Sequence, residues 1–198
     1  MAIKFQYNKT SLQRLEKQLS IRVKALPTIK NKEAALRMEV KKAKDKAEEL
    51  DRKVGEKMKE YEHMMRLWCE FDPDIVSIKK VESSAKKIAG VLTPVLEDIE
   101  FEIKDFSLFN KPDWFLDGIE ILKDLSKLVM ERDFFIRKME ILVYARKKTT
   151  QKVNLYEKVQ IPAYEDAIRK VKRFLEDEEN LSKSAQKIVK KRQQEVAL

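Results

Sequence analysis

Residues 36–54 read LRMEVKKAKDKAEELDRKV, and their apolar side chains recur in alternating steps of four and three residues. A repeat averaging about 3.5 residues keeps one narrow apolar seam against a partner helix, as in a coiled coil. Small side chains at Ala43 and Ala47 allow the two helices to approach closely. We therefore expect residues 1–69 to form a long coiled-coil helix, whose seam consists of Leu12, Leu15, Leu19, Val23, Leu26, Ile29, Leu36, Val40, Ala43, Ala47, Leu50, Val54, Met58, Tyr61, Met65 and Trp68.

The start of this helix carries three candidate N-caps, Asn8, Thr10 and Ser11, because their short polar side chains can accept hydrogen bonds from the first free backbone N–H groups. Pro27 interrupts the pattern. A proline inside a helix lacks a backbone donor and clashes with the preceding turn, so we expect a kink or a break there.

Residues 70–112 differ in character, since they contain three of the five prolines and one of the three glycines. Two stretches, Ile75–Val81 and Ile99–Ile103, alternate apolar and polar residues in the manner of strands. This pattern predicts a compact central segment with a short helix and a β-hairpin.

Helical periodicity returns after Pro112, a favourable first helical residue, and continues through residues 113–198 with an interruption at Pro162. The expected fold is therefore mainly α: a long antiparallel coiled-coil hairpin of the N- and C-terminal helices around the small central segment. Pairing residues whose numbers add to about 189 would set Pro27 opposite Pro162 and bend both helices at one level. The expected second seam consists of Ile119, Leu122, Leu125, Val129, Ile136, Met139, Val143, Val153, Ile168, Val171, Leu175, Leu181, Ala185 and Ile188.

The composition excludes several classes of protein. The single cysteine leaves no disulfide framework, and the three unclustered glycines cannot form a phosphate-binding loop. No apolar run is long enough for a membrane span, and a single cysteine is typical of a reducing compartment, so we expect a cytoplasmic protein. Because no catalytic or cofactor-binding motif is present, we also expect no cofactor and no catalytic site of its own. Glu60, Glu62 and His63 have the spacing of metal ligands, but a di-metal helical site needs a second histidine motif, and the chain has one histidine.

Charge is distributed unevenly along the chain. Residues 1–32 contain eight basic groups and one acidic group, residues 183–198 contain five and one, and residues 70–112 are net acidic. In an antiparallel hairpin the two basic ends lie at the same tip, which we expect to face an acidic partner, although a merely solvated tip remains an alternative. The candidate contact residues are Lys9, Arg14, Lys17, Arg22, Lys24, Lys30, Lys32, Lys187, Lys190, Lys191 and Arg192.

Nucleic-acid binding is a weaker interpretation of the basic sequence pI of about 9.4. Acidic residues alternate with the basic ones, and aromatic residues are not interspersed among them as a stacking platform requires. A coiled-coil scaffold or tether fits the heptads equally well.

Three motifs carry a family resemblance. Val153–Ile168 (VNLYEKVQIPAYEDAI) resembles the Val-Asn-x-x-Glu-x-x-x-Ile-Pro-x-x-Glu-x-x-Ile signature of the D subunit of V/A-type rotary ATPases. Ile29–Leu36 (IKNKEAAL) is similar to the Lys-x-Lys motif of that family's first helix, and Ile88–Pro94 (IAGVLTP) to its central Ile-Ala-Gly-Val-x-x-Pro. The matching positions are Val153, Asn154, Glu157, Ile161, Pro162, Glu165 and Ile168 in the first motif, and Ile88, Ala89, Gly90, Val91 and Pro94 in the central one.

The resemblance implies a non-catalytic central rotor shaft that couples ATP hydrolysis or synthesis to proton or sodium transport. In that family the two termini enter the ring of catalytic and regulatory head subunits, of A and B type. The central segment meets the small F subunit of the stalk and the funnel-shaped C subunit on the membrane rotor. The resemblance thus implies a place in a peripheral complex on the cytoplasmic face of a membrane.

Overall fold

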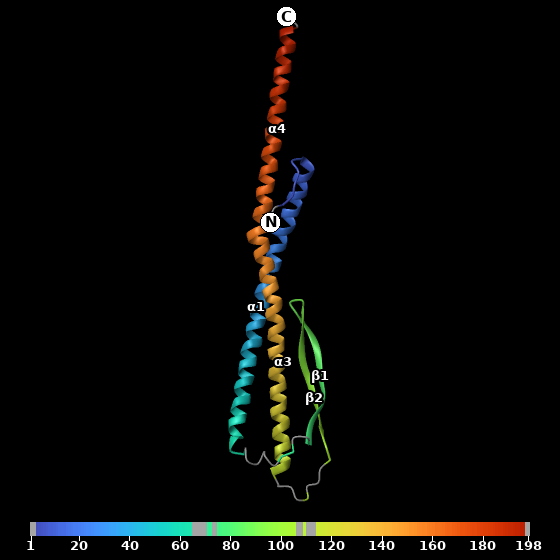
Figure 1. Cartoon of the computed structure of the whole chain (residues 1–198), viewed down its shortest axis with the longest axis vertical. Coiled ribbons are helices and arrows are strands. Elements are labelled where there is room, and N and C mark those ends of the chain that lie inside the picture. The colour runs from blue at the N-terminus through green and yellow to red at the C-terminus, as the bar shows by residue number, and fades with distance from the viewer. Residues whose placement is uncertain (1–2, 65–70, 73–74, 106–108, 110–113, 197–198) are drawn as a thin grey trace. The chain divides into compact units, whose positions relative to one another are not determined.

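The computed structural model describes residues 3–64, 71–72, 75–105, 109 and 114–196. Along the chain, one β-hairpin lies between two long helical segments, as predicted (Figure 1). Contacts group the chain into two units, one of residues 1–32 and 149–198 and one of residues 33–148, which are described separately. The elements are α1 (Lys9–Glu60), the 3₁₀ turn η1 (Glu62–Met64), β1 (Val76–Ile88), β2 (Val91–Ile103), α3 (Trp114–Asn154), the π-helix η3 (Leu155–Gln160) and α4 (Ile161–Val196).

Helix α1 begins at the predicted cap and continues through its proline. The Ser11 backbone N–H donates to Asn8 Oδ1 at 2.7 Å, so Asn8 is the N-cap among the three candidates. The helix is continuous over 52 residues with Pro27 inside it, so the predicted break is wrong. A proline removes a single backbone hydrogen bond, and the many intact turns on both sides keep the helix formed.

In the second unit, α1 and α3 pair around Leu36 and Leu142, both 0% exposed. The pair is antiparallel, because Arg132 Nη1 reaches Asp51 Oδ1 at 3.3 Å while Lys57 approaches the earlier Asp124 at 3.6 Å. The seam predicted over Leu36–Val54 is confirmed in α1, where Leu36, Val40, Ala43, Ala47, Leu50 and Val54 are all buried. Outside this stretch the prediction is wrong at Val23 and Met58, which are exposed.

The seam predicted for α3 is confirmed only in part: Ile119 is buried and Met139 packs against the cluster that contains Leu142. Ile136 and Val143, both expected in the seam, are 36% and 44% exposed, whereas Leu142 is fully buried. Because α3 packs against both α1 and the β-hairpin, its apolar residues are spread over two faces and no single heptad describes them.

The two predicted strand stretches do pair, with Val81 opposite Ile99 and Val76 opposite Ile103. The strands are nevertheless much longer than expected, 13 residues each, and a two-residue turn joins them. Ala89 and Gly90 occupy this turn with φ values of 47° and 81°, as a type I′ hairpin turn requires.

The turn also touches the helix pair. A positive φ is unfavourable for alanine by about 1 kcal/mol, and only glycine avoids this cost. The Ala89 side chain, however, packs against the buried cluster that contains Leu36 and Leu142, together with Val91. This contact offsets the strain and holds the hairpin turn against the helices.

A second cluster closes the other end of this unit, where Phe71 stacks on Phe115 with ring centroids 4.7 Å apart. Ile75 and Ile119 complete the buried cluster. The start predicted for this helix at Pro112 lies outside the described residues, and α3 is described from Trp114.

In the first unit, α1 pairs with α4 around Leu15, Ala167, Ile168 and Val171. The chain ahead of α1 folds back onto the same cluster, since Ile3 and Phe5 pack against it. The ring of Tyr7 lies 4.9 Å from that of Phe174. This short extended segment closes the last part of the pair.

Candidate partner-binding surfaces

The Val153–Ile168 motif spans a change in helix type. Leu155–Gln160 forms a π-helix, and the Ile161 backbone N–H donates to the carbonyl of Tyr156, five residues earlier. Pro162 follows directly and has no N–H to give to the carbonyl four residues before it. The π turn thus lies directly before the proline, and the helix continues past it as α4.

Two long cations of α1 bind this motif. Lys30 Nζ lies 2.6 Å from Glu157 Oε1, and Arg22 Nε donates to Gln160 Oε1 at 2.8 Å. The Arg22 guanidinium also lies 4.5 Å from the centroid of the Tyr164 ring. Both cations are among the predicted partner contacts, but here they tie α1 to the motif.

These contacts also fix the relative level of the two prolines. Gln160 and Tyr164 flank Pro162, so Arg22 lies level with that proline. Pro27 is five residues further along α1, or about 7.5 Å at a rise of about 1.5 Å per residue. The two prolines therefore lie within two helical turns of one another, as the hypothesis of a common bend requires.

The other motif residues divide between core and surface. Val153 and Ile168 are buried, Ile161 is half-buried, and Asn154, Pro162 and Glu165 are exposed. In the central motif Ile88, Ala89, Val91 and Pro94 are half-buried and Gly90 is exposed at the hairpin turn. The motif residues therefore account for three local features: the π turn, the ion pair between Lys30 and Glu157, and the hairpin turn.

From Glu16 to Ala35 and from Asn154 to Asp166 no side chain is buried. The nearest buried residues are Leu15 and Leu36 on α1 and Val153 and Ala167 on the C-terminal side. In this stretch half-buried apolar side chains, among them Leu19 and Tyr164 against the Leu15 cluster, pack beside the polar contacts of the long side chains.

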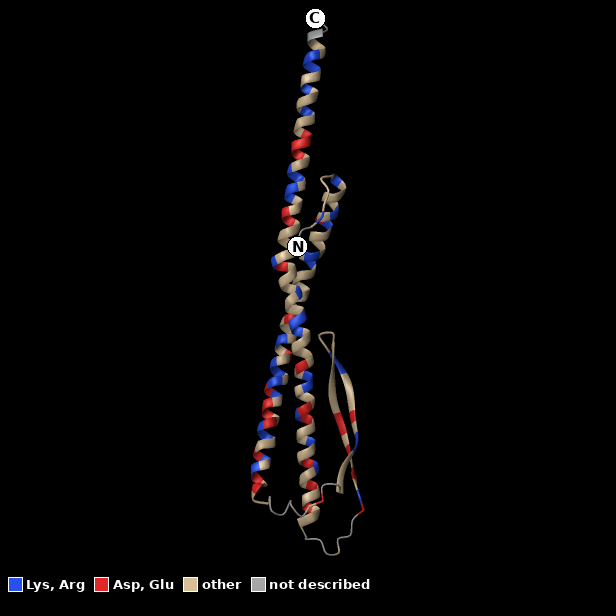
Figure 2. Cartoon of the chain, in the orientation of Figure 1, with Lys and Arg blue, Asp and Glu red and all other residues tan. Residues whose placement is uncertain are grey.

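The remaining predicted contact residues are exposed, and Figure 2 shows basic residues along both helices of this unit, with acidic residues among them. Those of α1 flank the helix pair, while Lys187–Arg192 lie further along α4. Because Phe174 is level with Tyr7, Lys187 lies about 20 Å beyond the start of α1. The basic residues of α1 and those of α4 therefore lie one after the other along the axis of this helix pair. These residues are Lys9, Arg14, Lys17, Lys24, Lys32, Lys187, Lys190, Lys191 and Arg192.

The last part of α4 lies open to solvent, and every side chain from Glu176 to Gln194 is exposed. We call residues 176–194 the tail. Leu181 is 72% exposed and Ile188 55%, which is unusual for large apolar side chains of a helix and marks a surface that a partner could cover.

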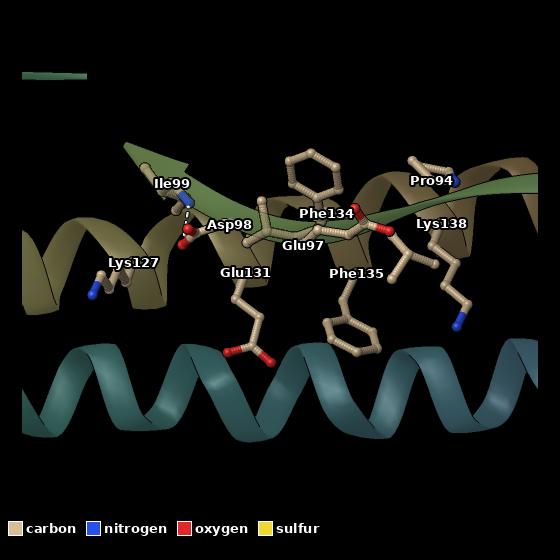
Figure 3. A pocket seen from close by; sticks show the side chains of 11 residues that line it. Pro94, Glu97, Asp98, Ile99, Lys127, Glu131, Phe134, Phe135 and Lys138 are labelled. Atoms are coloured by element: carbon tan, nitrogen blue, oxygen red, sulfur yellow. Dashed lines mark hydrogen bonds between the residues drawn. The ribbon is translucent and has the colours of Figure 1, made fainter. Parts of the chain in front are cut away.

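A groove of about 450 Å³ lies between β2 and α3 (Figure 3). Pro94 and Ile99 of the strand and Phe134 and Phe135 of the helix provide apolar walls, with Phe135 directed toward α1. Charges of both signs line its rim, namely Glu97, Asp98, Lys127, Glu131 and Lys138. Phe101 lies close by, its ring centroid 5.9 Å from Lys127 Nζ.

Within the described part of the chain, no group of histidine, cysteine and carboxylate side chains is arranged to hold a metal ion. His63 is exposed in the 3₁₀ turn, and Cys69 lies outside the described residues. None of the described helices is apolar over a length that would cross a bilayer.

Two features of these surfaces, the folded-back N-terminal segment and the π-helix, were not predicted from the sequence. The alternation of Ile3, Phe5 and Tyr7 is the signal that could have identified the folded-back N-terminal segment. The π-helix has no comparable signal, since Pro162 alone is equally compatible with a kink.

Comparison with known proteins gives a consistent result. The family described as the D subunit of ATP synthase matches residues 11–191. The chain is 30% identical to the V-type ATP synthase D subunit of Borreliella burgdorferi, over 94% of this chain and 94% of that protein. It is 27% identical to the V-type ATP synthase D subunit of Chlamydia muridarum, over 98% of both chains.

Proposed function

Because the chain belongs to the D-subunit family of ATP synthases, we propose that it is the non-catalytic central shaft of a V/A-type rotary ATPase. In this role it carries torque between ATP hydrolysis or synthesis in the head subunits and proton or sodium transport in the membrane rotor. The observation that carries the proposal is the antiparallel pair of α1 and α4, which continues as a single exposed helix.

The tail and the basic side chains around the start of α1 are the surfaces for the A- and B-type head subunits. Exposed, mobile Lys and Arg side chains suit contacts that are broken and remade as the shaft turns, because each contact is weak and long-ranged. The β-hairpin unit is the surface for the small F subunit of the stalk and the funnel-shaped C subunit. The protein then works on the cytoplasmic face of the membrane and binds no nucleic acid.

Reconstitution tests this proposal. The purified chain is mixed with the head subunits and the small stalk subunit of the same source, and the complex is examined by native mass spectrometry and by ATPase assay. We expect a stoichiometric complex with one copy of the chain and an altered ATP turnover. Failure both to assemble and to change turnover would show that the chain is not the shaft.

A matched pair of variants locates the head contact. Reversing Lys190 and Arg192 to Glu removes two charges from the basic end of the tail and should weaken assembly at least ten-fold. Reversing Lys41 and Lys59, exposed on α1 in the other unit, should leave head assembly unchanged. Equal losses in both variants would indicate a general effect of net charge and not a tail contact.

A further inference from the structure

The apolar seam of α4 continues past the point where its partner helix ends. Ala167, Val171 and Phe174, which face α1 and its N-terminal segment, are followed at steps of three and four residues by Leu181, Ala185 and Ile188 in the tail, with the charged Glu178 at the position between the two groups. Ala167 and Val171 are buried within the chain, Phe174 is 44% exposed although its ring meets Tyr7, and the three tail residues are exposed. A heptad seam of this kind is stable only when a second helix covers it.

Charge along the tail is polarised. Residues 176–179 are all acidic, whereas Lys183, Lys187, Lys190 and Arg192 are basic. Two seam positions are themselves charged, with Glu178 near one end and Arg192 near the other. Two copies of the tail therefore have complementary charges when they pair antiparallel, because the acidic end of each copy then meets the basic end of the other. A parallel pair would bring like charges together.

We propose that, outside the ATPase complex, the chain binds a second copy of itself through an antiparallel coiled coil of the two tails. The best register sets Leu181 opposite Ala185 of the second copy. Glu178 then meets Ile188 and lies within one helical turn of Arg192 of the second copy. A parallel pair would instead place Glu178 against Glu178 and Arg192 against Arg192 within the seam, where like charges repel.

The interface is small. Each tail contributes only Leu181, Ala185 and Ile188 from its own length, with Phe174 at its margin, so the buried area is below the roughly 1,200 Å² of stable complexes. We therefore expect a dissociation constant in the range of about 10–100 µM. The tail cannot bind a second copy and the proposed head subunits at once, so self-association belongs to the unassembled protein.

Sedimentation equilibrium of the full chain between about 10 and 500 µM tests the dimer. The wild type should pass from monomer to dimer across this range. L181D should remain monomeric, because it places a charge in the seam. Q186D, which adds the same charge on the outer face of the tail, should dimerise as the wild type does. A wild type that stays monomeric, or an L181D chain that dimerises normally, overturns the proposal.

Charge exchange tests the complementarity. D177K/E178K makes the tail predominantly basic, with Glu176 and Glu179 as its remaining acidic residues, and K191E/R192E makes it predominantly acidic. Each variant alone should self-associate at least ten-fold more weakly, and an equimolar mixture should form a heterodimer at least as tight as the wild-type dimer. Self-association that is unaffected by either variant, or a mixture that stays monomeric, would contradict the antiparallel interface.

The orientation is measured with one spin label per chain, attached to Q194C in a C69A background. In the antiparallel register residue 194 lies beside residue 172 of the second copy, so the two labels are about 33 Å apart at a rise of about 1.5 Å per residue. A parallel pair would bring the labels to about 10 Å. A short distance overturns the proposal, and because only the isolated chain is used, none of these outcomes bears on the proposed rotor function.

Discussion

Two glycines on the long helices, Gly55 in α1 and Gly118 in α3, have different surroundings. An added Cβ at Gly55 meets nothing within 4 Å, whereas at Gly118 it would lie 2.9 Å from Cζ3 of Trp114. Trp114 packs against Phe71 and Phe115, so its ring has little room to retreat. The first glycine is replaceable and the second is required by packing.

We therefore expect opposite effects from the same substitution. Gly55→Ala should raise the free energy of unfolding by about 1 kcal/mol, the helix-propensity difference. Gly118→Ala should lower it by about 1–3 kcal/mol, because overpacking outweighs that gain. Chemical denaturation of both variants and the wild type measures the difference, and stabilisation by Gly118→Ala would contradict the packing argument.

Glu49 is the residue with the most perturbed carboxyl among those described. Hydrogen bonds from Lys53 and Lys46, with their positive charges, lower the pKa of Glu49 from 4.5 to about 2. A depressed pKa in the folded state stabilises the protein above the ordinary value, and this contribution is lost as the pH falls from about 4.5 to about 2.

The measurement follows the difference in unfolding free energy between the wild type and Glu49→Gln. This difference should favour the wild type above pH 4.5 and shrink as the pH falls toward 2. It should be small, because the group is exposed to solvent. A carbon NMR titration should place the midpoint of the Glu49 carboxyl near 2, and an ordinary midpoint would remove the basis of the prediction.

At the scale of elements, α1 shows a proline held within a helix. Pro27→Ala restores a backbone donor and should raise the free energy of unfolding by about 3 kcal/mol. The matched control, Ala34→Pro at an exposed position of the same helix, should lower it by at least that amount. Thermal unfolding followed by circular dichroism measures both, and a destabilised Pro27→Ala chain would show that the proline makes contacts beyond its missing donor.

Most of the α1 seam could be predicted from the sequence because one partner covers one face, as at Val40 and Leu50. The α3 seam could be predicted only in part, since two neighbours share that helix: Ile119 is buried as expected, whereas Ile136 and Val143 are exposed. The spacing of apolar residues shows how many faces of a helix are apolar, but it does not show which neighbouring element covers each face.

The β-hairpin was predicted only at its base. Lys86, Lys87 and Pro94 break the alternation of apolar and polar residues in the remaining part of the two strands. A proline is nevertheless compatible with a two-stranded sheet, because each strand has a free edge where the missing N–H is not needed. Among the site residues, the ties of Arg22 and Lys30 depend on contacts more than a hundred residues apart in the chain, which spacing rules do not reach.

At the scale of the whole molecule, the two chain ends should contribute unequally to stability. Ending the chain at Leu175 removes only exposed side chains from the described structure, so the free energy of unfolding should change by less than about 0.5 kcal/mol. Removing residues 1–8 exposes the Leu15 cluster that Ile3 and Phe5 cover, and should cost about 2–4 kcal/mol.

Both truncated chains are compared with the wild type by denaturant unfolding at about 1 µM, well below the expected dissociation constant of the dimer, so that mass action does not contribute. A large loss on removing the tail would mean that it packs within the chain. No loss on removing residues 1–8 would mean that the N-terminal segment is merely adjacent to the cluster.

The pairing of Arg22 with Gln160 also has a consequence in time. The two residues are 138 positions apart, and a ribosome that adds about 5–20 residues per second needs roughly 7–28 s to make the second after the first. During this interval the first helix is in the cell without its C-terminal partner, whereas the β-hairpin, whose strands adjoin in sequence, can close at once. The end of the protein that is proposed to enter the head is therefore the last to fold, and it remains open to chaperones, or to a second nascent copy, until synthesis is almost complete.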